Sequence, residues 1–351
     1  MKTLSIIVPT YNVEDYLDKC LDSLIVNRDD LEVFVIIDGS KDRSIDIANK
    51  YRVNYPLLFK VIEKENGHYG SCVNIGLSMA QGKYIKVLDA DDYLDPNFIN
   101  YLEFLSTVDA DLILTDYTSV DSDYQDINTR RFSIGAMQLM KINSVIDRLD
   151  AMHHATITWR TELLRSIDYR QTEGIAFTDL EWVFLPFSQT KTVIYYPKTI
   201  YRYLRSRTGQ TIDIDFRKKN QWMENKVVLN LTERYEQLKH NDYSYNQEFL
   251  RTLLSNYITS VYYHYLLEYP NQLKETELIV FDEKLRNSSE EMYQLVNDTK
   301  DKRKYGTFYY IKDFRDKGTR KNMTYYFYDL CRFISRIVTK IKHPGKYVGG
   351  V

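Results

Sequence analysis

Two aspartates separated by one residue, Asp89 and Asp91, directly follow a short apolar run of the sequence. On an extended segment, side chains two residues apart point to the same side, so both carboxylates are expected to face one space. Without a cation they would repel each other and raise one pKa, and a hard divalent ion with oxygen ligands removes that conflict. The alternative is a solvated acidic turn that also caps a helix beginning near Asp95 and Pro96. The two aspartates alone do not decide between a metal site and a turn.

Two further groups of polar and turn residues follow apolar runs, Pro9 to Asn12 and Asp38 to Ser40. Each is weak evidence alone, because Asp, Asn and Gly are common in turns for conformational reasons. The β-branched runs that precede and separate these groups predict strands at residues 5–8, 33–37, 59–62, 84–88 and 111–114. Helical spacing of apolar residues predicts helices near 16–24 and 73–80.

This alternation predicts an α/β fold with a mostly parallel central sheet that is covered on both faces. In such sheets, ligands bind at the carboxyl ends of the strands, so the three polar groups are expected to meet at one edge. Residues 116–215 have an irregular pattern and are interpreted as an elaboration of the same domain. We therefore expect one domain at 1–215, with halves 1–115 and 116–215, followed by an α-helical region at 216–351.

The composition of the 351 residues, 44% hydrophobic and 27% charged, excludes disordered, collagen-like and disulfide-scaffold classes. The net charge of −2 argues against a nucleic-acid partner. The average conceals an asymmetry, because residues 301–351 carry a net charge of +9 and residues 1–300 one of −11. Three scattered cysteines suggest a reducing compartment, and no apolar run is long enough to span a membrane. A cytoplasmic location is expected.

A basic amphipathic helix is predicted from Tyr326 to Lys342. Its apolar stripe consists of Phe327, Leu330, Ile334, Ile337, Val338 and Ile341. Such a helix is typical of peripheral contact with an anionic membrane surface, including the inner face of the cell membrane. The alternatives are packing of the stripe on the helical region or on a second copy of the chain in a homodimer.

Taken together, the ordered motifs resemble the family 2 glycosyltransferases with the GT-A fold. The matching elements are Ser5 to Asn12, Asp38 to Asp42, Asn74 to Gly76 with Gly82 to Tyr84, and the Asp-x-Asp motif in Leu88 to Asp92. The resemblance implies an inverting, metal-dependent transfer of a hexosyl or N-acetylhexosaminyl group from a nucleotide sugar, usually UDP-linked, with Mn²⁺ or Mg²⁺. The implied acceptor is a hydroxyl of a glycan, a lipid-linked saccharide or a glycoprotein in the synthesis of a bacterial capsule or exopolysaccharide.

The resemblance also assigns roles to single residues. Pro9 and Tyr11 correspond to the residues that cradle uracil, and Asp38 to the carboxylate that accepts its N–H. Asp89 corresponds to the ribose contact and Asp91 to the metal ligand, with Asp89 as a second ligand and Ala90 between them in the donor site. Ile37 stands where the family usually has a first acid before Asp38.

Two loops are candidates for further donor contacts. The segment from Lys64 to Gly70, with Asn66 and Gly70, could form a wall of the donor site or a simple glycine-bearing loop capped by Ser71. His68 within it could be a ligand or an acceptor contact, but a lone histidine in a loop more often faces solvent, and that is the favoured interpretation. Arg205 and Arg207 could clamp a diphosphate or lie on a solvated basic loop.

The general base implied by the family is best matched by Asp179 in Phe177 to Trp182. Thr178 replaces the usual Glu, and Glu181 is a rival base. The structural alternative is that Thr178 caps a helix and Asp179 lies in its first turn. For His153 and His154, packing is favoured over an acceptor pocket.

Two other functions were considered. The replaced acids at Ile37 and Thr178 keep open a non-catalytic, nucleotide-binding assembly subunit of a glycosyltransferase complex. A nucleotidyltransferase would need a Gly-rich basic loop directly after the first strand, and the residues from Tyr11 to Asp18 offer none.

Overall fold

The structure is a computed structural model that describes residues 2–149, 152–205, 214–239, 246–303 and 306–342, with side chains described up to residue 334. The chain forms two compact units, residues 1–227 with 237–250, and residues 228–236 with 251–351. The first unit therefore extends past residue 215, where the sequence predicts a boundary. Each unit is described by itself.

The strands of the first unit are β1 (Leu4–Thr10), β2 (Leu31–Asp38), β3 (Phe59–Lys64), β4 (Tyr84–Val87), β5 (Tyr93–Leu94), β6 (Leu112–Val120), β7 (Asp126–Arg130), β8 (Met140–Lys141), β9 (Ile157–Arg160) and β10 (Thr192–Leu204). Its α-helices are α1 (Leu17–Asp22), α2 (Ser44–Asn54), α3 (His68–Met79), α4 (Phe98–Thr107), α5 (Thr161–Ser166) and α6 (Asp179–Phe187), followed by α7 (Ile214–Lys239). Short 3₁₀ turns lie at Ile142–Ser144, Ile146–Arg148 and His154–Thr156.

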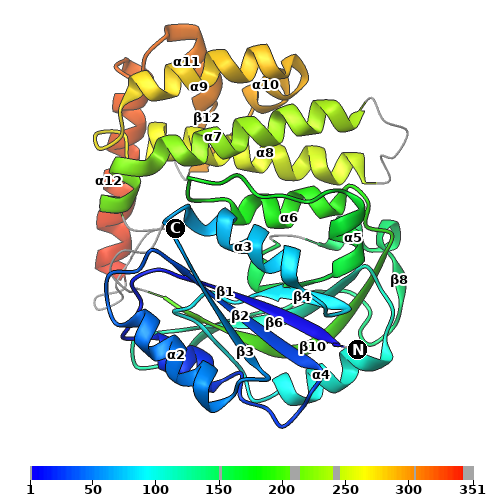
Figure 1. Ribbon diagram of the computed structural model, residues 1–351. Coiled ribbons are helices and arrows are strands. Elements are labelled where there is room, and N and C mark those ends of the chain that lie inside the picture. The colour runs from blue at the N-terminus through cyan, green and yellow to red at the C-terminus, as the bar shows by residue number, and fades with distance from the viewer. Residues whose placement is uncertain (1, 150–151, 206–213, 240–245, 304–305, 343–351) are drawn as a thin grey trace. The chain divides into compact units, whose positions relative to one another are not determined.

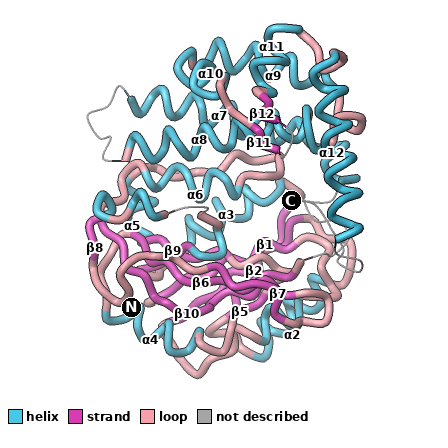
Figure 2. The backbone as a smooth tube through the Cα atoms, turned by 180° about the vertical axis from the view of Figure 1, so that it is seen from behind, coloured by secondary structure: helices cyan, strands magenta, loops and turns pink. Residues whose placement is uncertain are grey.

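These strands form one ten-stranded sheet in the order β3-β2-β1-β4-β9-β6-β10-β5, with β7 on β6 and β8 on β10 (Figures 1 and 2). The pairs β1–β2, β2–β3, β1–β4 and β6–β10 are parallel. Strand β9 is antiparallel to both β4 and β6 and lies between them. The predicted mixed α/β fold with a mostly parallel sheet is confirmed, and all five predicted strands are present.

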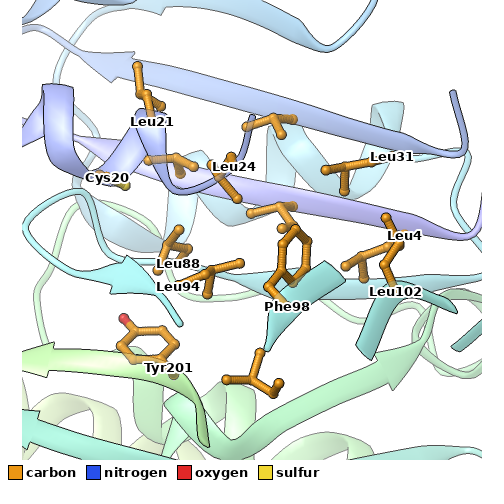
Figure 3. Packing of buried hydrophobic residues seen from close by; sticks show 14 of the residues in the cluster. Leu4, Cys20, Leu21, Leu24, Leu31, Leu88, Leu94, Phe98, Leu102 and Tyr201 are labelled. Atoms are coloured by element: carbon orange, nitrogen blue, oxygen red, sulfur yellow. The ribbon is translucent and has the colours of Figure 1, made fainter. Parts of the chain in front are cut away.

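The continuous apolar runs of β1 and β2 reflect burial on both faces of the sheet. One face packs against α1, α2 and α4, and Figure 3 shows part of this core, including Leu4, Leu21, Phe98 and Leu102. Helix α3 covers the other face. A Cβ built on Gly76 would lie 2.5 Å from the Ile7 side chain, so glycine permits this close helix–strand approach.

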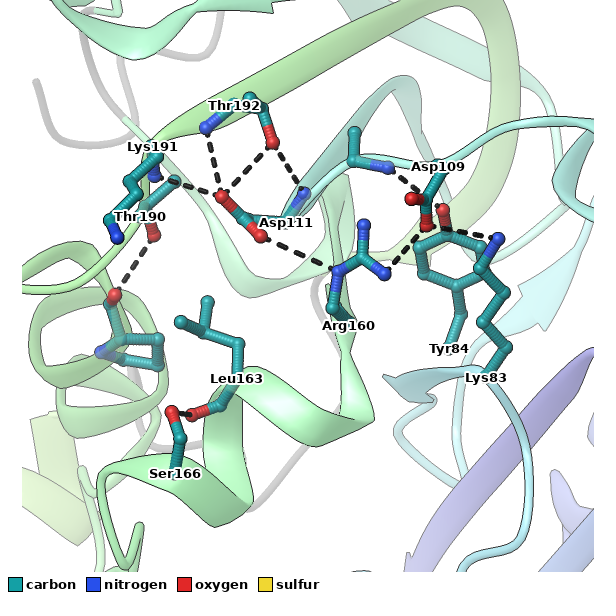
Figure 4. Close-up of polar contacts among 12 residues, drawn as sticks. Lys83, Tyr84, Asp109, Asp111, Arg160, Leu163, Ser166, Thr190, Lys191 and Thr192 are labelled. Carbon is teal, nitrogen blue, oxygen red and sulfur yellow. Dashed lines mark hydrogen bonds and ion pairs between the residues drawn. The ribbon is translucent and has the colours of Figure 1, made fainter.

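The strands β9 and β10 were not predicted, since their region lacks a clear period. In β10, Pro197 falls inside the strand, and the pairing with β6 shifts register between Tyr196 and Thr199. Polar contacts fix β9 and β10 at one edge of the sheet, opposite the edge where the parallel strands have their carboxyl ends (Figure 4). There Asp111 accepts hydrogen bonds from the backbone of Thr192 at 2.9 Å and pairs with Arg160, the last residue of β9, at 3.4 Å.

The second unit is mainly helical, as predicted for the C-terminal region. Its elements are the rest of α8 (Gln247–Tyr263), a π-helical turn (His264–Glu268), α9 (Glu275–Ser288), α10 (Glu290–Asn297), the hairpin β11 (Asp301–Arg303) and β12 (Gly306–Phe308), α11 (Tyr310–Lys317) and α12 (Met323–Lys342). Arg315 of α11 joins three helices. Its guanidinium donates to Asp282 of α9 at 2.8 Å and to the Tyr262 hydroxyl of α8 at 2.8 Å, and it lies 3.5 Å from the ring centre of Tyr293 in α10.

Helix α12 buries one side and exposes another. Tyr325 and Tyr328 are buried, whereas the predicted stripe residues Phe327, Leu330 and Ile334 are 54%, 53% and 40% exposed. The remaining stripe residues, Ile337, Val338 and Ile341, lie outside the described side chains. The described part of the stripe is therefore not the face that packs on the helical unit. Among the described residues, no helix combines the length and apolar character needed to cross a membrane.

Candidate active site

The turns after β1 and β2 are tied to each other at the carboxyl edge of the sheet. Asn12 and Gly39 both have left-handed backbones, with φ of 49° and 69°. The Asn12 side chain accepts from the Lys41 backbone N–H at 2.8 Å, and the Asn12 N–H donates to Ser40 Oγ at 3.2 Å. These bonds hold Tyr11, which is 49% exposed, beside the end of β2.

One oxygen of the Asp38 carboxylate is already bonded within the protein. Its Oδ1 accepts from Lys64 Nζ at 2.5 Å and from the Gly67 N–H at 2.8 Å. Asn66 donates to the Asp38 carbonyl at 3.0 Å. A Cβ on Gly39 would lie 2.9 Å from the Asn66 nitrogen, so glycine is needed where the two turns cross. The other carboxylate oxygen, Oδ2, has no hydrogen bond from the described residues.

Asp89, Asp91 and Asp92 can bring one carboxylate oxygen each within 4.8 Å of one another. Asp92 was not among the predicted site residues, and its side chain is buried. Its oxygens accept from the Tyr201 hydroxyl at 2.6 Å and the Leu204 N–H at 2.7 Å. Burial, and then the charges of Asp91 and Asp89, raise the pKa of Asp92 well above its ordinary value. The cluster suits a hard divalent cation, because Asp89 Oδ1 is buried without a hydrogen-bond partner among the described residues.

His154 forms an ion pair with Asp89. Its Nε2 lies 3.1 Å from Asp89 Oδ2. Burial acts to raise the pKa of Asp89, but the charge of His154 beside it outweighs burial and lowers it. Conversely, burial acts to lower the pKa of His154, and Asp89 raises it. His153 stacks on Tyr117 and contacts Tyr203 edge to face, and burial lowers its pKa to about 3. The packing interpretation fits His153, but not the ion-paired His154.

Asp179 is the first residue of α6, and two neighbours in sequence explain its position. Phe177 has a left-handed backbone with φ of 67°, an uncommon conformation for an aromatic residue. Thr178 occupies the N-cap position, as the structural alternative proposed, but its side chain makes no capping hydrogen bond. Burial raises the pKa of Asp179 above its ordinary value. The charge of His154 acts to lower this pKa and the charge of Asp89 acts to raise it, and the net shift is upward.

The rival base, Glu181, has a different environment. It is buried, and its two oxygens accept from the Thr172 N–H and hydroxyl, both at 2.7 Å. These bonds fix the loop before α6. Glu181 lines neither of the two cavities described next, so Asp179 is the better placed carboxylate.

A cavity of about 410 Å³, here called cavity A, lies at the carboxyl ends of β1, β2 and β4. It brings together seven residues predicted for the donor site. These are Pro9, Tyr11, Asp38, Asn66, Asp89, Ala90 and Asp91. The three polar groups that follow separate strands therefore do meet at one edge, as the sequence predicts.

A second cavity of about 280 Å³, cavity B, contains Asp179 together with His153, His154, Arg217 and Glu224. Arg217 donates to Glu224 at 2.6 Å, and its guanidinium lies 5.3 Å from the ring centre of Phe177. Cavities A and B share five lining residues, and so adjoin. The shared residues are His68, Tyr69, Asp89, Ala176 and Tyr203.

Several site residues were missed or misjudged from the sequence. His68 lines both cavities, although it was expected to face solvent. Arg217 and Glu224 lie beyond the predicted domain boundary, and polar residues on a helix give no signal of their own. Tyr69 offers a hydroxyl next to Asp89, and the only hint was its place in a glycine-bearing loop.

Two described residues that were predicted for the donor site, Gly70 and Arg205, do not line cavity A. Gly70 is buried in α3, where a Cβ would lie 2.2 Å from the Thr172 carbonyl oxygen. Glycine here therefore permits a close approach of α3 to the backbone of Thr172 and not to a donor. Arg205 directly follows β10 and has an exposed side chain. Arg207 lies outside the described residues. Their proposed contacts with a donor stay predictions.

Comparisons with known proteins agree with this geometry. Residues 5–165 match the family model described as Glycosyl transferase family 2. The chain is 34% identical over 121 residues to EpsH of Bacillus subtilis (strain 168), covering 34% of this chain and 35% of EpsH. It is 36% identical over 123 residues to a chondroitin synthase of Pasteurella multocida (strain Pm70), covering 34% of this chain and 13% of that protein. The matched segments thus span about a third or less of these relatives.

Among solved structures, residues 1–349 of S. aureus TarS in complex with UDP-GlcNAc share the fold. The TM-score is 0.61 at 20% sequence identity, covering 85% of this chain and 84% of the TarS chain. The similarity therefore extends beyond the family match into the helical region.

Proposed function

Because residues 5–165 match the model of Glycosyl transferase family 2, we propose that this protein is an inverting, metal-dependent glycosyltransferase. It transfers a sugar from a UDP-sugar to a hydroxyl of a glycan, a lipid-linked saccharide or a glycoprotein in surface polysaccharide synthesis. The observation that carries the proposal is the pair of adjoining cavities. One contains the predicted nucleotide residues with Asp89 and Asp91, and the other contains Asp179.

The nucleotide end of cavity A supports a uridine donor. Tyr11 offers an exposed aromatic ring for stacking on a base. Asp38 Oδ1 is occupied by Lys64 and Gly67, which leaves Oδ2 to accept one N–H. Uracil presents one such imide N–H, whereas guanine presents two adjacent donors that suit a carboxylate with both oxygens available. UDP-GlcNAc is bound by the similarly folded TarS, which is consistent with a uridine nucleotide here.

The diphosphate end of cavity A holds the acidic cluster. Asp91 and Asp89 would hold Mn²⁺ or Mg²⁺, with Asp92 fixing the turn through Tyr201 and Leu204. When bound, such an ion stabilises the negative charge on the departing nucleoside diphosphate. His154 holds Asp89 ionised and oriented.

On the acceptor side, Asp179 is assigned as the general base. Its carboxylate takes the proton of the acceptor hydroxyl as that oxygen bonds to the anomeric carbon from cavity B. The bond between the anomeric carbon and the diphosphate oxygen breaks on the opposite side, so the anomeric configuration inverts. The pair Arg217 and Glu224 offers both donors and acceptors for hydroxyls of the acceptor.

We propose further that the protein acts in the cytoplasm, at the inner face of the cell membrane. The exposed stripe of α12 and the net charge of +9 in residues 301–351 support contact with anionic lipid. A homodimer through the same stripe is the competing arrangement.

The test is transfer from a panel of UDP-, GDP- and dTDP-sugars with Mn²⁺, combined with calorimetric binding of the nucleotides. Asp179→Asn is expected to lower kcat by about 10²- to 10⁴-fold while UDP binding is retained, because only proton transfer is removed. Asp91→Ala is expected to abolish metal-dependent UDP binding. Full activity of either variant would refute its assigned role, and retention of anomeric configuration would refute the mechanism.

The alternative, a non-catalytic assembly subunit, predicts a different outcome of the same experiment. Failure of the wild-type protein to bind any nucleoside diphosphate in the presence of metal would favour a subunit whose nucleotide-type fold serves assembly alone. Binding without transfer to any acceptor tested, combined with no effect of Asp179→Asn on donor hydrolysis, would favour a non-catalytic subunit that binds nucleotide.

A further inference from the structure

His68 lies where cavities A and B meet. It is one of the five residues that line both cavities, together with Tyr69, Asp89, Ala176 and Tyr203. Under the proposed function, the nucleotide occupies cavity A and the acceptor occupies cavity B. The transferred sugar must then lie at the junction, because its anomeric carbon has to face both the diphosphate and the acceptor hydroxyl.

The His68 backbone is held in a conformation that disfavours histidine. Its φ of 62° lies in the left-handed region, which is unfavourable for a residue with a side chain and readily adopted by glycine. The residue begins α3, and its carbonyl accepts from the Ser71 hydroxyl at 2.7 Å. This local structure needs only backbone atoms of residue 68, so glycine would satisfy it equally well.

The imidazole itself makes no hydrogen bond, ion pair or ring contact with the described residues. Among the described residues, neither ring nitrogen has a hydrogen-bond partner, and the ring stacks on none of the aromatic side chains. A strained residue whose side chain stabilises nothing and borders the reaction space fits a functional requirement for that side chain. Uncharged imidazole carries one donor and one acceptor, which match neighbouring hydroxyl groups of a sugar ring.

We propose that His68 is a specificity-determining residue that hydrogen-bonds the sugar being transferred. The inference rests on the proposed function, since it needs a nucleotide sugar in cavity A. The imidazole contacts the sugar and not the nucleotide base. The residues that meet the base, Tyr11 and Asp38, line cavity A alone, whereas His68 lies at the junction. His68 therefore increases the affinity for UDP-sugar and leaves the affinity for UDP unchanged.

The test compares His68→Gly with a matched control, Met137→Gly. Met137 also has a left-handed backbone, with φ of 57°, but it is 54% exposed and lines neither cavity. Both substitutions relieve the same strain, so both variants should keep the wild-type Tm or exceed it slightly. Calorimetry with UDP, and with each UDP-sugar of the panel in the presence of Mn²⁺, gives the affinity added by the sugar.

For His68→Gly we expect unchanged UDP affinity, a loss of roughly tenfold in the extra affinity for the preferred UDP-sugar, and weaker discrimination among sugars. kcat/KM for transfer should fall by a similar factor, whereas Met137→Gly should behave as wild type in every assay. His68→Asn, which tolerates the left-handed backbone and keeps a donor and an acceptor, should recover part of the loss.

Two results separate the failure of this inference from the failure of the proposed function. If wild-type protein binds UDP and UDP-sugars but His68→Gly retains their full difference in affinity and the same sugar preference, His68 does not contact the sugar. If wild-type protein binds no uridine nucleotide at all, the proposed function itself is wrong. Unfolding of His68→Gly while Met137→Gly remains folded would show that the side chain is structural, which would also overturn the inference.

Discussion

The chemical role of each aspartate at the site depends on which of its oxygens the protein already uses. Both oxygens of Asp92 are bonded inside the fold, and so are both oxygens of Glu181. Asp38 has one occupied oxygen, and Asp89 Oδ1 has no partner among the described residues. The sequence presents all of these as similar acidic residues in turns. Their separation into structural and reactive groups needs the three-dimensional contacts.

The single available oxygen of Asp38 leads to a prediction on base selectivity. Lys64→Met removes the cation from Asp38 Oδ1 and should weaken UDP binding by roughly tenfold, while GDP binding changes less, so the preference for uridine decreases. Calorimetric titration with both nucleotides measures this. Lys60→Met is the control, because Lys60 lies on the same strand and pairs with Glu32 at 2.8 Å. An unchanged ratio of UDP to GDP affinity in Lys64→Met would contradict the assigned role of Asp38.

The raised pKa of Asp179 predicts the acid limit of activity. A base works only when deprotonated, so a pKa raised by burial moves the acid limb of kcat/KM above the pH expected for an ordinary aspartate, near 4. His154 lowers the pKa of Asp179, and His154→Gln should therefore move the acid limb to still higher pH. The pH profile of transfer measures both shifts, and an acid limb of His154→Gln at lower pH than wild type would contradict the electrostatic coupling.

At the scale of elements, the sequence predicts those parts that repeat a regular pattern. The buried runs of β1 and β2, the helix over α3 and the loop after β4 all follow from local periodicity and turn residues. The strand β10 does not, because Pro197 interrupts it and its pairing with β6 is irregular. The same reasoning explains why Arg217 and Glu224 were not predicted as site residues. Polar residues on a long helix are normally solvated, and only tertiary packing brings these two to cavity B.

The close packing of α3 on β1 predicts the effect of enlarging Gly76. Gly76→Ala places a methyl group against Ile7 and should lower the free energy of unfolding by about 1–3 kcal/mol through overpacking. Ile7→Ala removes both γ carbons that the new methyl group would meet, so the double variant should lose less than the sum of the single losses. Urea denaturation of the four proteins measures the coupling. Strict additivity would show that the two residues do not interact.

At the scale of the whole molecule, the chain combines an acidic body with a basic C-terminal segment, and it carries an exposed apolar stripe within that segment. The near-neutral net charge of −2 hides both. Two stripe residues of α12, Phe327 and Leu330, are more than half exposed, and so are the neighbouring aromatic residues Tyr326 and Phe333. The composition alone could not identify this surface, because burial of Tyr325 and Tyr328 distinguishes the two faces of α12 only in the structure.

The exposed stripe predicts membrane binding that depends on lipid charge. The protein should sediment with vesicles rich in anionic phospholipid and much less with neutral vesicles, and added salt should weaken the binding. Phe327→Glu with Leu330→Glu should abolish it. Ile279→Glu with Val280→Glu, on an exposed part of α9 in the same unit, is the matched control. Equal binding by both double variants would exclude α12 as the membrane contact, and loss of a homodimer in the α12 variant would favour the competing arrangement.

The common wall of cavities A and B sets a limit on how substrate preference can diverge by substitution. A change at His68, Tyr69 or Tyr203 alters the surroundings of both occupants at once, so it should change KM for donor and acceptor together. Independent variation is open only to residues that line one cavity, such as Asp38 on the donor side and Arg217 on the acceptor side. Under the proposed function, descendants of this protein should therefore exchange acceptors mainly through the first turns of α7, while residues of the common wall change as a set.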